Sequence, residues 1–200
     1  MAYTDKNKLR VVYGDYTLGV HGDGFDYIFS YSQGGLESIV KKGYEWLYRC
    51  PKPTFWRALT DNDRGSRFHI KSGSWLASDM FIDCKKTEVI MDGELQKQYA
   101  PDNNSYGGDV AAGEIIVKYT YETVGNPVTT VIVSYTIDVI GNIKVDVDYT
   151  GVKGLPELPV FGMRFIMPTL ADKYMTRDYR GKPIRTERQG QKKEFMRYQI

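Results

Sequence analysis

Three consecutive segments of this chain alternate apolar and polar side chains at every second position. They cover residues 114–124, 128–139 and 143–149, and short Gly/Asn-containing connections separate them. Successive side chains of a β-strand point to opposite faces, so each segment would have one apolar and one solvated face. Connections of this length and composition are typical of turns between antiparallel strands. The pattern therefore predicts an antiparallel meander, whose apolar faces comprise Ile115, Val117, Tyr119 and Tyr121, then Val131, Val133 and Tyr135, then Ile143, Val145, Val147 and Tyr149.

Shorter segments of the same kind occupy the N-terminal part of the chain. We expect strands at residues 9–13, 16–20, 25–31, 36–40 and 44–48, and further strands at 82–91 and 160–167. Aromatic residues make up 14% of the 200 residues, which favours β-structure. In residues 25–31 the aromatic side chains of Phe25, Tyr27, Phe29 and Tyr31 would share one face. The chain is predicted to be all-β, an antiparallel β-sandwich or a barrel.

Residues 50–81 depart from this pattern. The run Cys50-Pro51-Lys52-Pro53 is expected to break any strand ladder, because proline has no amide hydrogen. Residues 74–81 are expected to form one or two helical turns, with Trp75, Leu76 and Met80 on roughly one side.

Composition excludes several classes of protein. A net charge of +2 favours neither a disordered chain nor a strongly polyanionic partner. No apolar run approaches the roughly 18 residues of a membrane helix, and the polar N-terminus does not resemble a signal peptide. Two cysteines are too few for a disulfide scaffold, so a cytoplasmic location is expected, with neither membrane nor nucleic acid as partner.

Residues able to carry chemistry are scarce. His21 and His69 are the only histidines and lack metal-ligand spacing, and Cys50 and Cys84 do not form a CxxC motif. Nothing in the spacing of Asp61, Asp63 and Asp79 fixes the carboxylate separation that a glycosidase requires. The sequence therefore assigns no catalytic residue, metal ligand or cofactor to this chain.

The segment FWRALTDNDRG, residues 55–65, is the most informative one. It provides the candidate binding or interface residues Trp56, Arg57, Asp61, Asn62, Asp63 and Arg64. Two interpretations remain open. Asp and Asn readily bond their own backbone, so Arg57 could pair with Asp61 or Asp63 in a self-satisfied loop. Alternatively, the segment is a contact surface for a sugar or a partner domain.

FWRALTDNDRG resembles the signature of the C-terminal β-sandwich domain, domain 5, of glycoside hydrolase family 2 β-galactosidases. The match is closest to the separately encoded small subunit of the heterodimeric type. Further segments agree in order, namely NKLRVVYGD, GLESIVKKGYEWLYRCPKPTFWRA, WLASDMF and KGLPELPVFGMRFIMP. The resemblance covers roughly residues 1–174 and departs at Leu59, where the family usually has Pro or another small residue. It implies a galactose mutarotase-like supersandwich, incomplete at its C-terminus.

The resemblance also implies a role. Such enzymes hydrolyse terminal non-reducing β-D-galactosides such as lactose with retention, through two glutamates on a (β/α)8 barrel that binds Mg²⁺. The barrel lies in the large subunit, and this chain is too short for one of about 250 residues. The chain would pack against the large subunit and complete the active-site wall without catalysing the reaction. The alternative is a stand-alone carbohydrate-binding or interaction β-sandwich with Trp56, Trp75 and residues 61–64 as its platform.

Residues 175–200 differ in character from the rest. They hold eight Lys/Arg and three Asp/Glu and lack a strand period. They could be a solvated, disordered terminus or a basic arm for nucleic acid or a membrane. A third hypothesis follows from the resemblance. One permitted choice of codons for residues 175–191, read two bases later, encodes DKGLSGETYPDRKAGA, which is like the family's next segment. The chain would then be a frameshifted, truncated small subunit with strand edges and apolar faces left uncovered.

Overall fold

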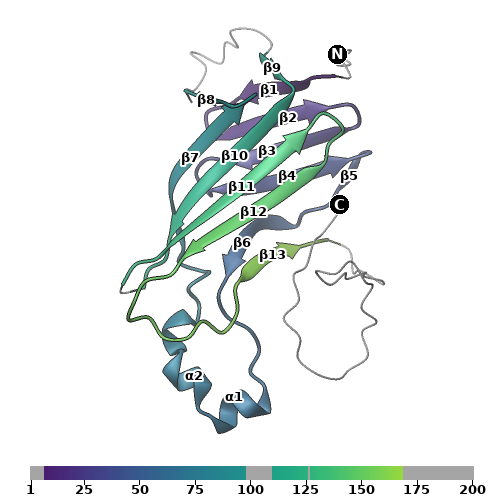
Figure 1. Cartoon of the computed structure of the whole chain (residues 1–200). Helices are drawn as coiled ribbons and strands as arrows, with labels where there is room; N and C mark the ends of the chain where they lie inside the picture. The colour runs from purple at the N-terminus through teal and green to yellow at the C-terminus, as the bar shows by residue number, and fades with distance from the viewer. Residues whose placement is uncertain (1–6, 98–109, 126, 169–200) are drawn as a thin grey trace, which may run out of the picture. The chain divides into compact units, whose positions relative to one another are not determined.

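The computed structural model describes residues 7–97, 110–125 and 127–168. These residues form mostly β-strands in antiparallel sheets with a few short helices, which confirms an all-β sandwich (Figure 1). The predictions about residues 175–200 lie outside the described residues. Figure 1 shows one layer formed by β7, β8 and β10–β12 in front of a second layer formed by β1–β5 and β9.

The first sheet has the strand order β5-β4-β3-β2-β1-β9. Phe25, Tyr27 and Phe29 are buried on one face of β3, as the alternation predicted, and Tyr31 follows them half-buried. The strand predicted at residues 44–48 is shorter in the structure. The strands are β1 (Leu9–Tyr13), β2 (Thr17–Gly22), β3 (Phe25–Ser30), β4 (Gly35–Lys41), β5 (Tyr44–Glu45) and β9 (Val110–Ala112).

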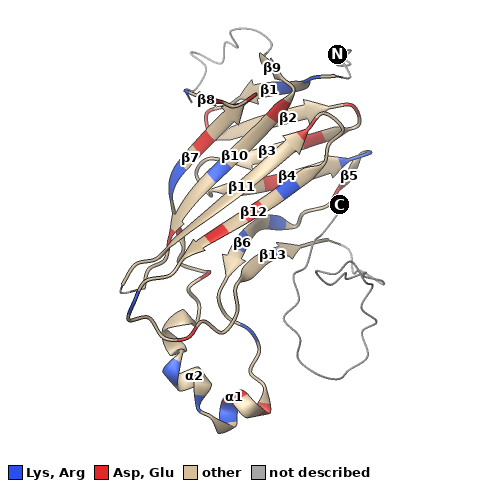
Figure 2. Ribbon diagram, in the orientation of Figure 1, with Lys and Arg blue, Asp and Glu red and all other residues tan. Residues whose placement is uncertain are grey.

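The second sheet has the order β12-β11-β10-β7-β8 and contains the predicted meander. Its strands are β7 (Asp83–Met91), β8 (Glu94–Gln96), β10 (Glu114–Glu122), β11 (Thr130–Asp138) and β12 (Ile143–Thr150). The predicted apolar faces of β10 and β11 are completely buried. The face predicted for β12 also points inward but is only half-buried. The opposite faces carry mixed charge (Figure 2).

The two sheets are joined through buried tyrosines. The hydroxyl of Tyr119 donates to the carbonyl of Gly35 at 3.2 Å, and that of Tyr121 donates to Gly34 at 2.6 Å. Burial raises the pKa of both phenols far above its ordinary value, so both remain protonated donors. The rings of Phe29 and Tyr135 meet edge to face at 5.7 Å. One aromatic core therefore lies between the two sheets.

The prolines do not interrupt the chain as predicted. Residues 49–54 form β6 (Arg49–Thr54), which pairs antiparallel with β13 (Gly162–Ile166) in a two-stranded sheet, so the predicted break of the ladder is wrong. Pro51 and Pro53 are two residues apart, so their nitrogens lie on the same edge of the strand. A strand tolerates prolines on an edge that needs no donor.

The helical prediction is also wrong in its position. The helices are α1 (Asp61–Gly65), α2 (Phe68–Lys71) and a 3-10 turn at Gly73–Trp75. Leu76 and Met80, predicted to lie on roughly one side with Trp75, are exposed, whereas Trp75 is buried. The physical reason is Ala77, whose positive φ of 64° ends any right-handed helix there.

Candidate functional site

The start of helix α1 is fixed by its own side chains. Thr60 is the N-cap, and its hydroxyl accepts the backbone N–H of Asp63 at 3.2 Å. In return, Oδ2 of Asp63 accepts the backbone N–H of Thr60 at 2.7 Å. This reciprocal arrangement is a capping box, formed here with Asp at the third helical position. The sequence TDND therefore specifies where the helix begins.

Arg57 is held against the same carboxylate. Its Nη1 lies 2.5 Å from Oδ2 of Asp63 and its Nη2 lies 3.1 Å from Oδ1, a two-pronged ion pair. Its Nε donates to the carbonyl of Pro159 at 3.2 Å, which ties the segment to the chain before β13. The hydrogen bonds from Arg57 and Thr60 hold the pKa of Asp63 well below its usual range. The predicted pairing of Arg57 is confirmed, and Asp63 is the partner.

The other candidate residues have different surroundings. Asp61 pairs with Arg64 at 2.7 Å on the outer side of α1, where both are well exposed and such a pair contributes little. Asn62 is also exposed on α1. Trp56 is half-buried and packs against the core. The structure thus joins Arg57 with Asp63 and leaves Asp61, Asn62 and Arg64 on the surface.

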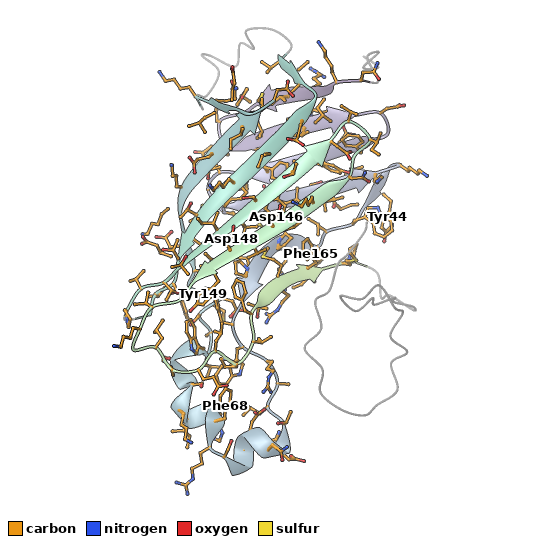
Figure 3. All side chains as sticks on the ribbon, viewed as in Figure 1. Tyr44, Phe68, Asp146, Asp148, Tyr149 and Phe165 are labelled. Carbon is orange, nitrogen blue, oxygen red and sulfur yellow. The ribbon has the colours of Figure 1, made fainter. Side chains whose placement is uncertain are left out.

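Aromatic stacking anchors the segment to the sandwich. Phe55 is completely buried, and its ring stacks on Trp75 with centroids 5.6 Å apart. The indole N–H of Trp75 donates to the carbonyl of Pro156 at 3.1 Å, and only 3% of Trp75 is exposed. The prediction of Trp75 as part of a sugar platform is therefore wrong, because its ring is not accessible. Tyr149 of β12 lies beside this aromatic group (Figure 3).

A second ion pair holds the far end of the segment. Asp79 lies 3.1 Å from Nη1 of Arg164 on β13, and Nη2 of Arg164 donates to the hydroxyl of Thr54 at 2.9 Å. Sequence reasoning missed this pair, because residues so far apart in sequence carry no local signal of their contact. We call residues 55–81, held at both ends in this way, the lobe.

The lobe presents apolar side chains to solvent. Ile70, Leu76, Met80 and Phe81 are 67%, 60%, 75% and 63% exposed. We call these four residues the lobe patch. Large exposed apolar side chains mark an interaction surface where they form a contiguous patch. This patch was not predicted from the sequence, which placed Leu76 and Met80 on the same side of a helical turn as the buried Trp75.

The charged side chains of the lobe that form buried or half-buried contacts stabilise its fold. Both oxygens of Asp63 are occupied by Arg57 and Thr60, and its lowered pKa leaves it without a proton to give as a general acid.

Among the described residues, no three His, Cys, Asp or Glu side chains are grouped to hold a metal ion. Burial raises the pKa of the Cys50 thiol to about 11, so it is a poor nucleophile at neutral pH. No helix in the described ranges is long and apolar enough to cross a membrane.

Comparison with known proteins decides the family. A family model described as "Beta galactosidase small chain" matches residues 21–181. The chain belongs to the β-galactosidase small-chain family. A β-galactosidase small subunit from Latilactobacillus sakei is 55% identical over 176 residues, which are 88% of this chain and 55% of the relative.

Longer β-galactosidases contain the same region. The enzyme of Clostridium acetobutylicum is 36% identical over 82% of this chain but only 16% of its own length, and that of Halalkalibacterium halodurans is 32% identical over 82% and 14%. The small-chain region described here thus spans about half of the related small subunit and a small part of the longer enzymes.

Proposed function

We propose that this chain is a non-catalytic component of a β-galactosidase that hydrolyses terminal β-D-galactosides such as lactose. A large subunit would supply the catalytic glutamates and bind Mg²⁺, and this chain would complete the wall of the active site. The observation that carries the proposal is the lobe. Its signature carboxylate, Asp63, is used for structure, while its apolar side chains face solvent.

The lobe patch is the proposed contact with the large subunit. Ion pairs at both ends and the Phe55–Trp75 stack hold the lobe in one conformation, so little ordering entropy would be lost on binding. Apolar side chains on a fixed support are typical of the buried centre of an interface. Arg64, Asp61 and Asn62, on the exposed side of α1, would lie at the rim of the contact. The proposed location is the cytoplasm, where thiols such as those of Cys50 and Cys84 stay reduced.

Reconstitution tests this proposal. The purified chain is mixed with the large subunit of an L. sakei-type β-galactosidase, and hydrolysis of a chromogenic β-galactoside is measured. We expect the mixture to exceed the large subunit alone. Met80→Asp should reduce the gain, because it places a charge in the lobe patch. Leu95→Asp is the matched control, since Leu95 is also a large exposed apolar residue, at 64% against 75% for Met80, but lies on β8. No gain on mixing, or equal effects of both variants, would contradict the proposal.

The alternative function, a stand-alone carbohydrate-binding sandwich, has less support. Trp75 is buried and offers no face for stacking on a sugar, and only part of Trp56 is exposed. Galactose binding by the isolated chain that is lost in Trp56→Ala would favour this alternative over the subunit role.

A further inference from the structure

The unpaired charges of the lobe are positive. Among its Lys, Arg, Asp and Glu side chains, the two without an ion pair in the described part of the chain are Arg67 and Lys71. Every acidic side chain of the lobe already has an arginine partner. These pairs are Asp61–Arg64 at 2.7 Å, Asp63–Arg57 at 2.5 Å and Asp79–Arg164 at 3.1 Å. The lobe therefore presents uncompensated positive charge.

Both unpaired cations lie beside the lobe patch. The carbonyl of Arg67 accepts the backbone N–H of Ile70 at 3.0 Å and that of Lys71 at 3.2 Å, so the three residues share one helical turn. Ile70, a member of the lobe patch, is 67% exposed, and Arg67 and Lys71 are exposed as well. Figure 2 shows Lys and Arg residues along α1 and α2. An exposed apolar side chain therefore has two exposed cations within one turn of it.

Arg67 occupies a backbone conformation that favours glycine. Its φ of 56° and ψ of 32° place it in the left-handed region at the start of α2. Its side chain forms no hydrogen bond or ion pair with the described residues. An arginine here thus destabilises the local backbone without a polar contact inside the lobe that offsets this effect. Such a residue is better explained by a role outside the chain.

We propose that the lobe patch binds an apolar surface of the large subunit whose border carries Asp or Glu side chains facing Arg67 and Lys71. This inference rests on the proposed function and adds the charge of the partner surface. Opposite charges at the rim of an interface accelerate the encounter, whereas the apolar centre mainly sets how slowly the complex dissociates. Arg67 and Lys71 would therefore act on the association rate, and Met80 on the dissociation rate.

Other occupants match this face less well. Residues 175–200 of the chain itself hold eight Lys/Arg and three Asp/Glu, so their charge has the same sign as that of the face. Two copies meeting through their lobe patches would likewise bring like charges together, which opposes that symmetrical arrangement. A nucleic acid presents phosphates along its whole length, and two cations beside an apolar patch provide few contacts for them. A protein surface with a carboxylate border complements both the apolar and the charged part.

Association kinetics test the proposal. The full chain is mixed with the large subunit of an L. sakei-type β-galactosidase, and the association and dissociation rates are measured at low and at high salt. We expect the double variant Arg67→Glu/Lys71→Glu to associate about tenfold more slowly at low salt, with dissociation changed less than about twofold. The difference should shrink at high salt, because salt screens exposed charges.

The outcomes separate this inference from the proposed function. Failure of the parent chain to form a complex would contradict both. A complex that Met80→Asp weakens, but whose association rate is the same for the parent and the double variant, would overturn the inference and leave the proposed function standing. Tight binding of a DNA duplex by the chain alone, lost in the double variant, would also overturn the inference, because it would assign the two cations to phosphates.

A glycine variant separates binding from folding. Arg67→Gly removes the charge and suits the left-handed backbone, so it should leave the thermal stability equal or higher while slowing association by roughly threefold or more. Lys42 is the matched control, since it is also exposed, has a φ of 54° and lies in the turn between β4 and β5, outside the lobe. Lys42→Gly should likewise not lower the stability and should leave association unchanged. Equal association of Arg67→Gly and the parent, or equal slowing by both glycine variants, would overturn the inference.

Discussion

Asp63 illustrates how one side chain can specify a local structure. It caps α1 through Thr60 and neutralises Arg57, which in turn bonds the carbonyl of Pro159. Removing its charge would leave Arg57 without its ion-pair partner and weaken the capping box of α1. The signature therefore encodes a support for the lobe.

The depressed pKa of Asp63 predicts a pH dependence. Because the folded-state pKa lies below the ordinary value of 3.8, the ionised carboxylate stabilises the fold fully above about pH 4. That contribution is lost as pH falls toward the folded-state pKa. We expect Asp63→Asn to be less stable than the parent at pH 7 and the difference to shrink at pH 3. Urea unfolding at both pH values measures this, and a difference independent of pH would contradict it.

Truncating Phe55 is expected to destabilise the fold far more than truncating an exposed aromatic residue. It is completely buried between Trp75, Tyr149 and Phe161. Phe55→Ala should lower the free energy of unfolding by about 3–5 kcal/mol, because it removes apolar contact and leaves a cavity. Tyr16→Ala, at an exposed position, should stay within about 0.5 kcal/mol of the parent. Chemical denaturation compares the two.

The sequence predicted the candidate site in part. It identified the segment from Trp56 to Arg64 and the two possible partners of Arg57, since residues six apart in a polar loop can meet. It could not identify the Asp79–Arg164 pair, because that contact depends on how β13 packs beside β6. It missed the lobe patch because the helix expected at residues 74–81 does not form.

Among the elements, strands with strict alternation were predicted well. The faces of β3, β10 and β11 agree with the structure because each is set by side chains two residues apart. The helices were misplaced because α1 depends on a cap and the following segment is interrupted by Ala77. β6 was missed because the cost of a proline depends on which edge of the strand it occupies.

Two turns that contain glycine allow a matched comparison of Gly→Ala substitutions. Gly24 and Gly141 have nearly equal φ values of 78° and 77°. A side chain at Gly24 would meet open space, whereas a Cβ at Gly141 would lie 2.5 Å from the Phe25 ring. Gly24→Ala should cost about 1 kcal/mol for the left-handed backbone. Gly141→Ala should cost about 1–3 kcal/mol more from overpacking. Equal thermal stabilities of the two variants would contradict the packing at this turn.

For the whole molecule, the exposed lobe patch predicts that the isolated chain self-associates in water. We expect low solubility, or improved solubility when a partner is present. Light scattering across a concentration series measures this. A stable, monodisperse monomer in dilute buffer would contradict the expectation.

The frameshift hypothesis for residues from about Tyr174 onward remains a prediction. The coding strand should encode a segment like GLSGETYPDR when read two bases later from the codon of Met175. Sequencing the gene tests this, and its absence in that frame would leave a divergent basic tail as the explanation.

The central claim is that this chain supports a reaction whose carboxylates belong to another subunit. The most direct measurement is the turnover of a chromogenic β-galactoside by the chain purified alone. We predict none above the rate without protein, with activity only after the large subunit is added. Turnover by the isolated chain, abolished by replacing one of its own aspartates or glutamates, would contradict the claim.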